Sequence, residues 1–279
     1  LMVSDSKGFA WCFACNNGGD IYSFVQKVEN CSFPEALRTL AEKAGVPLKE
    51  YRPPSNSEEA ERERALDILD AAAAFFVKQL QASSRARDEL GKRHLPHNVL
   101  TDFQVGFAPD AEHALEKLLL ELGYARKEMR AAGLVTADER EQGAVRDKFR
   151  NRLMFPIRNT RGHIVGFGGR YIGSSDKAPK YLNSPETKLY KKSEILYGLH
   201  EAKDAIRKAK AVILVEGYFD VLACVAAGVP HVVAVSGTAF STEHARLLKR
   251  FAQTIILALD VDTAGQAASR RTAAIAYRS

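Results

Sequence analysis

Ala211-Val-Ile-Leu-Val215, followed directly by Glu216-Gly217, opens the stretch that decides the fold of this chain. Two more short apolar runs follow, at His231–Val235 and Thr254–Leu259, and a segment with helical periodicity precedes each of them. Short β-branched runs that alternate with helical segments are typical of βαβ units. We therefore predict a parallel sheet covered by helices in this part of the chain.

Acidic residues follow two of the three predicted strands. Glu216 ends the first run, and Asp260-Val-Asp262-Thr-Ala-Gly265 follows the third. Because ligands of parallel sheets bind beyond the carboxyl ends of the strands, Glu216, Asp260 and Asp262 are expected to converge at one edge. Carboxylates gathered in this way hold hard divalent cations, usually Mg²⁺. The alternative is that these acids are merely solvated, since an acid at a strand end and a D-x-D pair are both common.

Two other cation- or phosphate-binding motifs are excluded. An EF-hand loop that began at Asp260 would need Glu at its twelfth position, which is Arg271. The G-x-x-x-x-G-K-[ST] pattern of a P-loop is absent from the sequence. The combination of Glu216-Gly-Tyr-Phe-Asp220 with Asp260–Gly265 instead resembles the Toprim domain of topoisomerases and primases.

Length and composition limit the function classes. The 279 residues suit two domains, and a net charge of +6 with a pI near 9.1 allows a polyanionic partner without requiring one. The sequence has no run of eighteen apolar residues and no secretory signal, so we expect no membrane partner. Its four cysteines do not form a disulfide framework, which favours a reducing, cytoplasmic compartment. The ends at Leu1 and Ser279 suggest a piece cut at both ends.

Cys12 and Cys15 form a C-x-x-C pair that precedes Gly18-Gly19. Two cysteines on such a knuckle supply half of a tetrahedral zinc site, which needs four ligands. Cys31 is close in sequence, but we expect it inside a helix and therefore not as a ligand. The alternative is a redox pair or two free thiols, although no thioredoxin-like βαβ pattern surrounds them.

A linker at 51–57, Tyr51-Arg-Pro-Pro-Ser-Asn-Ser57, marks the clearest domain boundary. Helical patterns cover 20–45 before it. After it they cover 58–80, 84–94 and 110–132, and a short helix with a turn is predicted for 95–107.

The segment 146–192 contains twelve Lys or Arg and three acids, a net charge of +9 against +6 for the whole chain. Strand patterns at Leu153–Ile157 and His163–Phe167 interrupt the charges, and Gly168-Gly169 precedes Arg170. Basic strands that alternate with glycine suit a phosphate-binding surface. A solvated surface explains the pattern equally well.

Four short motifs, in this order, resemble the polymerase domain of bacterial DnaG-type primases: Lys148–Ile157, Gly166–Arg170, Lys180–Thr187 and Leu196–Leu199. The resemblance covers nearly the whole chain and implies a mixed α/β (α+β) fold. Its expected parts are a partial zinc-ribbon domain with trailing helices (1–50), the linker (51–57), a basic amino-terminal subdomain (58–205) and a carboxyl-terminally truncated Toprim domain (206–279). The sequence departs from the family at Asn17, Ser193 and Phe240-Ser241.

The resemblance implies a DNA-templated RNA polymerase that makes short primers by two-metal nucleotidyl transfer. Asp260 and Asp262 would hold Mg²⁺ or Mn²⁺, Glu216 would be a further ligand or the proton acceptor, and Asp220 would support a ligand or start a helix. Basic side chains would bind single-stranded DNA template, RNA primer or nucleoside triphosphates: Arg146, Arg152, Arg170, Lys180 and Lys192. Zn²⁺ would bind Cys12 and Cys15 weakly or not at all because the site is incomplete, and a replicative helicase would bind through a domain absent here.

The residues alone leave two other functional classes open. Another Toprim enzyme, a topoisomerase or nuclease, shares the acidic motif, but the nine tyrosines lie in no context recognisable for a topoisomerase nucleophile. A non-catalytic single-strand-binding protein would share the basic segment. Nucleotide incorporation on a single-stranded template separates all three.

Overall fold

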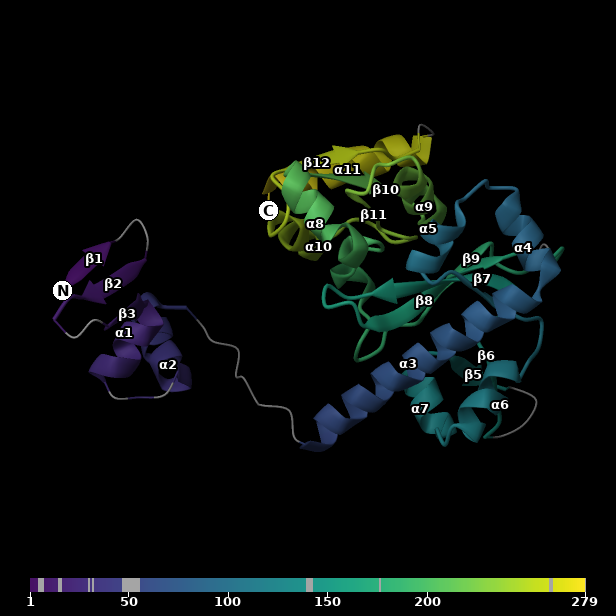
Figure 1. Cartoon of the computed structure of the whole chain (residues 1–279), viewed down its shortest axis with the longest axis horizontal. Coiled ribbons are helices and arrows are strands. Elements are labelled where there is room, and N and C mark those ends of the chain that lie inside the picture. The colour runs from purple at the N-terminus through teal and green to yellow at the C-terminus, as the bar shows by residue number, and fades with distance from the viewer. Residues whose placement is uncertain are drawn as a thin grey trace. The chain divides into compact units, whose positions relative to one another are not determined.

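The chain divides into two compact units, Leu1–Asn56 and Ser57–Ser279, in the computed structural model (Figure 1). The structure describes residues 1–4, 8–14, 17–29, 31, 33–46, 56–138, 143–175, 177–260 and 263–278. The division falls within the predicted linker at 51–57, of which 51–55 lies outside the described residues. Within the described part of the chain, no helix combines the length and apolar content needed to cross a bilayer.

The first unit is a small antiparallel sheet followed by two helices. Its elements are β1 (Met2–Ser4), β2 (Phe9–Cys12), β3 (Asn17–Asp20), α1 (Ile21–Val28) and α2 (Phe33–Ala44). Gly18 faces the Trp11 ring, where a Cβ would come within 2.2 Å of a ring carbon, so glycine is needed at this position. Asp20 begins α1 by accepting the Ser23 N–H at 2.8 Å. The prediction that Cys31 lies inside a helix is wrong, because Cys31 lies in the connection between α1 and α2.

A four-stranded antiparallel sheet lies at the centre of the second unit. Its order is β4 (Gly106–Ala108), β7 (Arg152–Arg158), β8 (Ile164–Tyr171) and β9 (Tyr181–Asn183). The strands predicted at 153–157 and 163–167 are β7 and β8. A short helix with a turn was predicted for 95–107, but the last two residues of that range belong to strand β4. Gly106 approaches α3 so closely that a Cβ would lie 2.5 Å from Phe76 Cβ, and this contact is invisible in the local pattern.

The long helix α3 packs on this sheet through aromatic residues, because the rings of Phe76 and Phe167 meet edge to face at 5.3 Å. The helical region predicted at 110–132 is interrupted by Gly123, whose φ of 82° ends one helix before the next begins. Apart from β4, the elements that precede β7 in the second unit are α3 (Asn56–Ala82), α4 (Ser84–Gly91), α5 (His97–Asp102), α6 (Ala114–Glu121), α7 (Arg126–Ala131) and a hairpin of β5 (Val135–Ala137) and β6 (Val145–Asp147).

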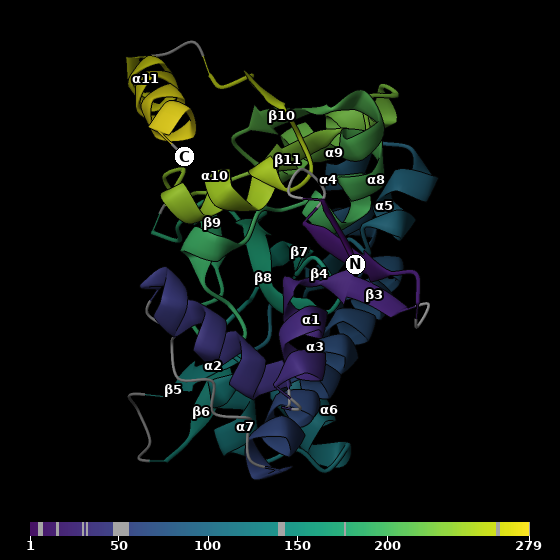
Figure 2. The ribbon, with the colours of Figure 1, turned by 90° about the vertical axis from the view of Figure 1, so that its left-hand side faces the viewer.

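The predicted parallel sheet is confirmed: β10 (Ala211–Val215) pairs in parallel with both β11 (Val232–Ala234) and β12 (Thr254–Leu257). Its helices are α8 (Leu199–Ala209), α9 (Tyr218–Ala226), α10 (Thr242–Lys249) and α11 (Thr263–Arg278). Val215 belongs to a core with α9, whereas Leu214 belongs to another core with α8 and α10. The sheet is therefore covered on both faces (Figure 1). Helix α5 lies beside α9 in both views (Figure 1 and Figure 2).

Tyr218 joins the four-stranded sheet to the parallel sheet. Its ring stacks on Phe155 of β7 at 4.8 Å with an interplanar angle of 5°. It covers Gly168 of β8, where a Cβ would lie 2.1 Å from a ring carbon. Asn183 of β9 accepts the Tyr218 hydroxyl at 2.7 Å and donates to the Ser236 carbonyl at 2.7 Å. One hydrophobic core consequently crosses the boundary predicted between 205 and 206.

Buried Asp147 gives the second unit a predicted pH dependence. Its carboxylate accepts the N–H groups of Leu115 and Glu116, at 2.7 and 2.9 Å, in the first turn of α6. Burial raises the pKa of Asp147 to about 6, and the two N–H donors only partly oppose this shift. Because the folded-state pKa lies above the unfolded value, this contribution to stability is greatest at low pH and decreases as the pH rises through about 6. Chemical denaturation from pH 4 to 7 should therefore show a steeper loss of unfolding free energy in the wild type than in Asp147→Asn. Equal slopes would contradict the assignment.

Candidate functional site

The acidic site forms at the carboxyl edge of the parallel sheet. Glu216 directly follows β10, and Asp260 lies three residues after the neighbouring strand β12. One carboxylate oxygen of Glu216, Oε1, accepts the backbone N–H of Asp260 at 3.0 Å. The carbonyl of Glu216 accepts the N–H of Ser236 at 2.9 Å, which ties the end of β10 to the end of β11. The structure therefore brings Glu216 and Asp260 together. Asp262 lies outside the described residues.

Gly265 explains the spacing of the Asp260–Gly265 motif. Its α-carbon faces the backbone of Asp260, and a Cβ would lie 2.0 Å from the Asp260 carbonyl oxygen. Any larger residue would have to displace either the start of α11 or Asp260 itself. Glycine at this position allows the first turn of α11 to fold back against the strand end that carries the acid.

The donor set suits a hard divalent cation. Glu216 Oε2 and the exposed Asp260 carboxylate have no hydrogen-bond or ion-pair partner among the described residues. Carboxylate oxygens are the ligands that Mg²⁺ and Mn²⁺ prefer. No group of three or more His, Cys, Asp or Glu suited to a metal occurs within the described ranges, which do not include Asp262. Of the three predicted metal ligands, Glu216 and Asp260 are therefore the two that the structure describes.

Asp220 has a local structural contact. Its Oδ2 accepts the N–H of Gly217 at 2.9 Å, so the side chain caps the first turn of α9. This contact agrees with the helix-start interpretation of Asp220.

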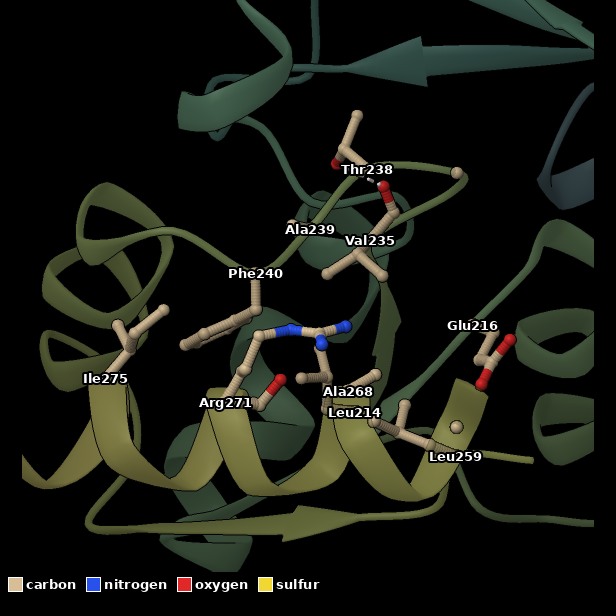
Figure 3. Close-up of a pocket in the computed structure, with 13 residues that line it drawn as sticks. Leu214, Glu216, Val235, Thr238, Ala239, Phe240, Leu259, Ala268, Arg271 and Ile275 are labelled. Atoms are coloured by element: carbon tan, nitrogen blue, oxygen red, sulfur yellow. Dashed lines mark hydrogen bonds between the residues drawn. The ribbon is translucent and has the colours of Figure 1, made fainter. Parts of the chain in front are cut away.

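A cavity of about 460 Å³ lies next to Glu216, between the loop 237–240 and α11. Its lining is mainly apolar. Figure 3 shows the guanidinium of Arg271 extending from α11 into this space, with Phe240 on one side and Glu216 at its edge. The cavity therefore combines one cation with one member of the acidic pair. In the sequence, Arg271 is notable only as the residue at the EF-hand position that would need Glu.

Two lysines without a carboxylate partner lie close enough to affect each other. Lys148 is half-buried, and its pKa is lowered first by burial and then by the charges of Lys192 and Arg152. Neither lysine forms an ion pair within the part of the chain that the structure describes. Adjacent unpaired ammonium groups favour an anionic ligand. Lys148 was absent from the predicted site residues, although it begins the Lys148–Ile157 motif.

Arg152 differs from its predicted role. Its side chain is buried, and Nη1 donates to the carbonyls of Gly169 and Pro179 at 3.2 and 2.9 Å. The structure therefore assigns this guanidinium to the protein backbone, where it supports β8 and the segment before β9, and not to a phosphate contact as predicted.

The other predicted basic residues are partly or fully accessible. Arg170 on β8 donates to the Tyr181 hydroxyl at 3.1 Å and lies 5.5 Å from the centroid of the Phe219 ring. Lys180 is exposed and directly precedes β9 of the same sheet. Arg146 lies on β6, in a separate two-stranded sheet. We call Lys148, Arg170, Lys180 and Lys192 the basic group.

The cysteine pair is only partly described. Cys12 ends β2, opposite Asn17 of β3. Cys15 lies outside the described residues. The described residues therefore do not assemble a zinc ligand set.

Three protein families match successive parts of the chain. The CHC2 zinc finger matches residues 1–55, the amino-terminal domain of the DNA primase catalytic core matches 75–203, and a Toprim-like family matches 213–279. The DNA primase of Halalkalibacterium halodurans is 42% identical over 98% of this chain and 46% of its own length. The DNA primase of Streptomyces coelicolor is 40% identical over 97% of this chain and 43% of its own length. The chain thus spans less than half the length of these relatives.

Solved primase structures agree with the fold. The Aquifex aeolicus primase, comprising zinc-binding and RNA polymerase domains, has a TM-score of 0.73 and 34% identity, covering 98% of this chain and 65% of that one. The RNA polymerase domain of Mycobacterium tuberculosis primase has a TM-score of 0.70 and 39% identity, covering 75% of this chain and 70% of that one. A DnaG primase catalytic domain bound to single-stranded DNA has a TM-score of 0.69 and 36% identity, over 76% of this chain and 66% of that one. The chain belongs to the DnaG family of bacterial DNA primases.

Proposed function

We propose that this chain carries the centre for DNA-templated synthesis of short RNA primers. The observation that supports this most directly is the contact of Glu216 with the Asp260 backbone at the carboxyl edge of the parallel sheet. Phosphodiester formation requires a 3′-hydroxyl nucleophile and an α-phosphate held in line. An acidic pair and a group of basic side chains in the same unit would meet the two needs of such a reaction, a metal site and a site for phosphates.

Glu216, Asp260 and Asp262 would hold Mg²⁺ or Mn²⁺. When bound, such cations neutralise charge on the attacking and leaving oxygens. The N–H of Asp260 holds Oε1 of Glu216, which fixes the orientation of the carboxylate and directs Oε2 away from this bond. Glu216 is therefore preorganised as a ligand or as the acceptor of the 3′-hydroxyl proton.

The basic group would bind the phosphates of single-stranded template, RNA primer or nucleoside triphosphate, and Arg146 would extend this surface on β6. Lys148 and Lys192 support this assignment, since neither has a carboxylate partner among the described residues and the charge of one is unfavourable for the other without an anion. The relative whose solved structure holds single-stranded DNA supports the template as one ligand.

The remaining family properties are proposals for this chain. We assign 1–50 to a partial zinc-ribbon domain in which Cys12 and Cys15 would supply half of a Zn²⁺ site, 51–57 to the linker, 58–205 to the basic subdomain and 206–279 to the Toprim domain. The matches to the CHC2 zinc finger and the Toprim-like family support zinc and divalent-cation binding. A replicative helicase is the expected partner of the longer protein, in the cytoplasm.

Incorporation of labelled ribonucleotides on a single-stranded DNA template tests the function. We expect products that require template and either Mg²⁺ or Mn²⁺. If the chain binds the template but incorporates no ribonucleotide with either metal, the catalytic proposal is wrong and a binding function remains. Relaxation of supercoiled DNA or template cleavage would indicate a different Toprim activity.

The salt dependence of DNA binding tests the basic group. Each lost phosphate contact should reduce the log–log slope by about 0.7 for a single strand, so Lys192→Ala and Lys148→Ala should each flatten it by about this amount. Lys117→Ala, an exposed change on α6, is the matched control and should leave the slope unchanged. Fluorescence anisotropy of a labelled oligonucleotide at several salt concentrations measures the slope. A wild-type slope in both lysine variants would show that the group is an ordinary solvated surface.

A further inference from the structure

The first turn of α10 contains an unusual cap. Ser241 Oγ accepts the N–H of His244 at 3.0 Å, and His244 Nδ1 accepts the N–H of Ser241 at 3.2 Å. This is a capping box in which histidine takes the place usually held by Glu or Gln. Because Nδ1 is the acceptor, the proton of the neutral ring lies on Nε2. His244 therefore presents a single N–H donor on the side of the ring away from the cap.

That donor reaches the segment that carries Lys192. His244 Nε2 lies 3.0 Å from the Lys192 carbonyl oxygen and 3.1 Å from that of Ile195. Ser241 Oγ also donates to the carbonyl of Ser193 at 2.6 Å. The start of α10 thus holds three carbonyls of the 3-10 turn η2 (Lys192–Glu194) and the residue after it.

The same turn is held from its other side. The N–H of Lys192 donates to Glu186 Oε1 at 2.9 Å, so both backbone groups of Lys192 are engaged. The side chain of Lys192 itself has no hydrogen-bond partner among the described residues. His244 is completely buried, which shields its hydrogen bonds from competition with water. The partly exposed Lys192 side chain therefore extends from a backbone that hydrogen bonds hold on both sides.

We propose that His244, with Ser241, is a positioning residue that anchors the Lys192 turn to α10 and thereby holds the Lys192 ammonium in place for phosphate binding. This inference rests on the proposed role of Lys192. It adds a physical connection between the parallel sheet and the basic group, since α10 covers that sheet and η2 carries a member of that group. His244 touches neither substrate nor metal, and it acts only through Lys192.

A double-mutant cycle in the full chain tests the proposal, with Kd for a fluorescein-labelled single-stranded oligodeoxynucleotide as the readout. His244→Phe keeps a ring and removes both nitrogens. It should weaken binding about fivefold, the effect of about one net hydrogen bond. In a Lys192→Ala background it should change Kd by less than about twofold, because the group that it positions is absent. His244→Gln, which retains a side-chain N–H donor for the turn, should restore Kd to within about twofold of the wild type.

The outcomes separate positioning from general support of the fold. If His244→Phe weakens binding equally in both backgrounds, or if His244→Gln fails to rescue although it folds, the positioning role is wrong. If Lys192→Ala leaves Kd unchanged, the phosphate contact proposed for Lys192 is absent, and the positioning role proposed for His244 is wrong as well. Should His244→Phe fail to fold, Ser241→Ala enters the same cycle with the same criterion, since it removes the contact with Ser193.

Discussion

Glu216→Gln is expected to reduce primer synthesis about a thousandfold while the chain still folds and binds template. Removing one charged metal ligand takes away several kcal/mol of transition-state stabilisation, and each 1.36 kcal/mol corresponds to about tenfold in rate. Glutamine retains a side-chain oxygen that accepts the Asp260 N–H, so the local structure is preserved and the loss reports on charge. Ribonucleotide incorporation at millimolar Mg²⁺ measures the rate, and thermal unfolding measures the fold.

Two further variants sharpen this test. Asp260→Asn should cause a loss of similar size, because it removes the neighbouring charge. Asp220→Asn should retain activity within about tenfold, since the amide oxygen still accepts the Gly217 N–H that caps α9. Near-normal synthesis by Glu216→Gln would remove the acidic pair from the mechanism, and a thousandfold loss in Asp220→Asn would show that Asp220 acts through its charge.

Gly168→Ala is expected to lower the unfolding free energy of the second unit by about 3 kcal/mol. The new Cβ would lie 2.1 Å from the Tyr218 ring, which cannot retreat because it is stacked on Phe155. For a unit of this size the change corresponds to a melting temperature lower by about 6–12 °C. Differential scanning calorimetry gives the value directly.

Gly91→Ala is the matched control for this prediction. Gly91 ends α4, has no positive φ, and a Cβ there would meet no atom within 4 Å. Alanine should therefore raise the unfolding free energy by about 0.5–1 kcal/mol. If Gly168→Ala melts at the temperature of Gly91→Ala or above it, the packing between β8 and Tyr218 is not the constraint described here.

Local sequence patterns were sufficient for the parallel sheet and for the acidic edge. Strands β10, β11 and β12 are each short apolar runs, and the carboxyl ends of parallel strands meet at one edge. The sequence alone therefore predicts that Glu216 and Asp260 lie close together. The short strand β4 was missed because three residues are too few for a recognisable period, and its partner strand β7 is distant in the sequence.

The roles of individual basic residues depend on contacts between distant segments. In the sequence, Arg152 and Lys192 are equivalent members of a charged segment, but burial commits Arg152 to the carbonyls of Gly169 and Pro179. Lys148 is included in the basic group only because the charge of Lys192, more than forty residues away in the sequence, affects it. His244 lies in an ordinary amphipathic pattern, and its hydrogen bonds to the Lys192 turn span 52 and 49 residues. Period and motif specify strands, helices and the ends of strands because these are local properties of the chain. Burial and hydrogen-bond partners are set by packing between elements. Whether a charged side chain binds the backbone or stays accessible to a ligand therefore depends on the tertiary structure.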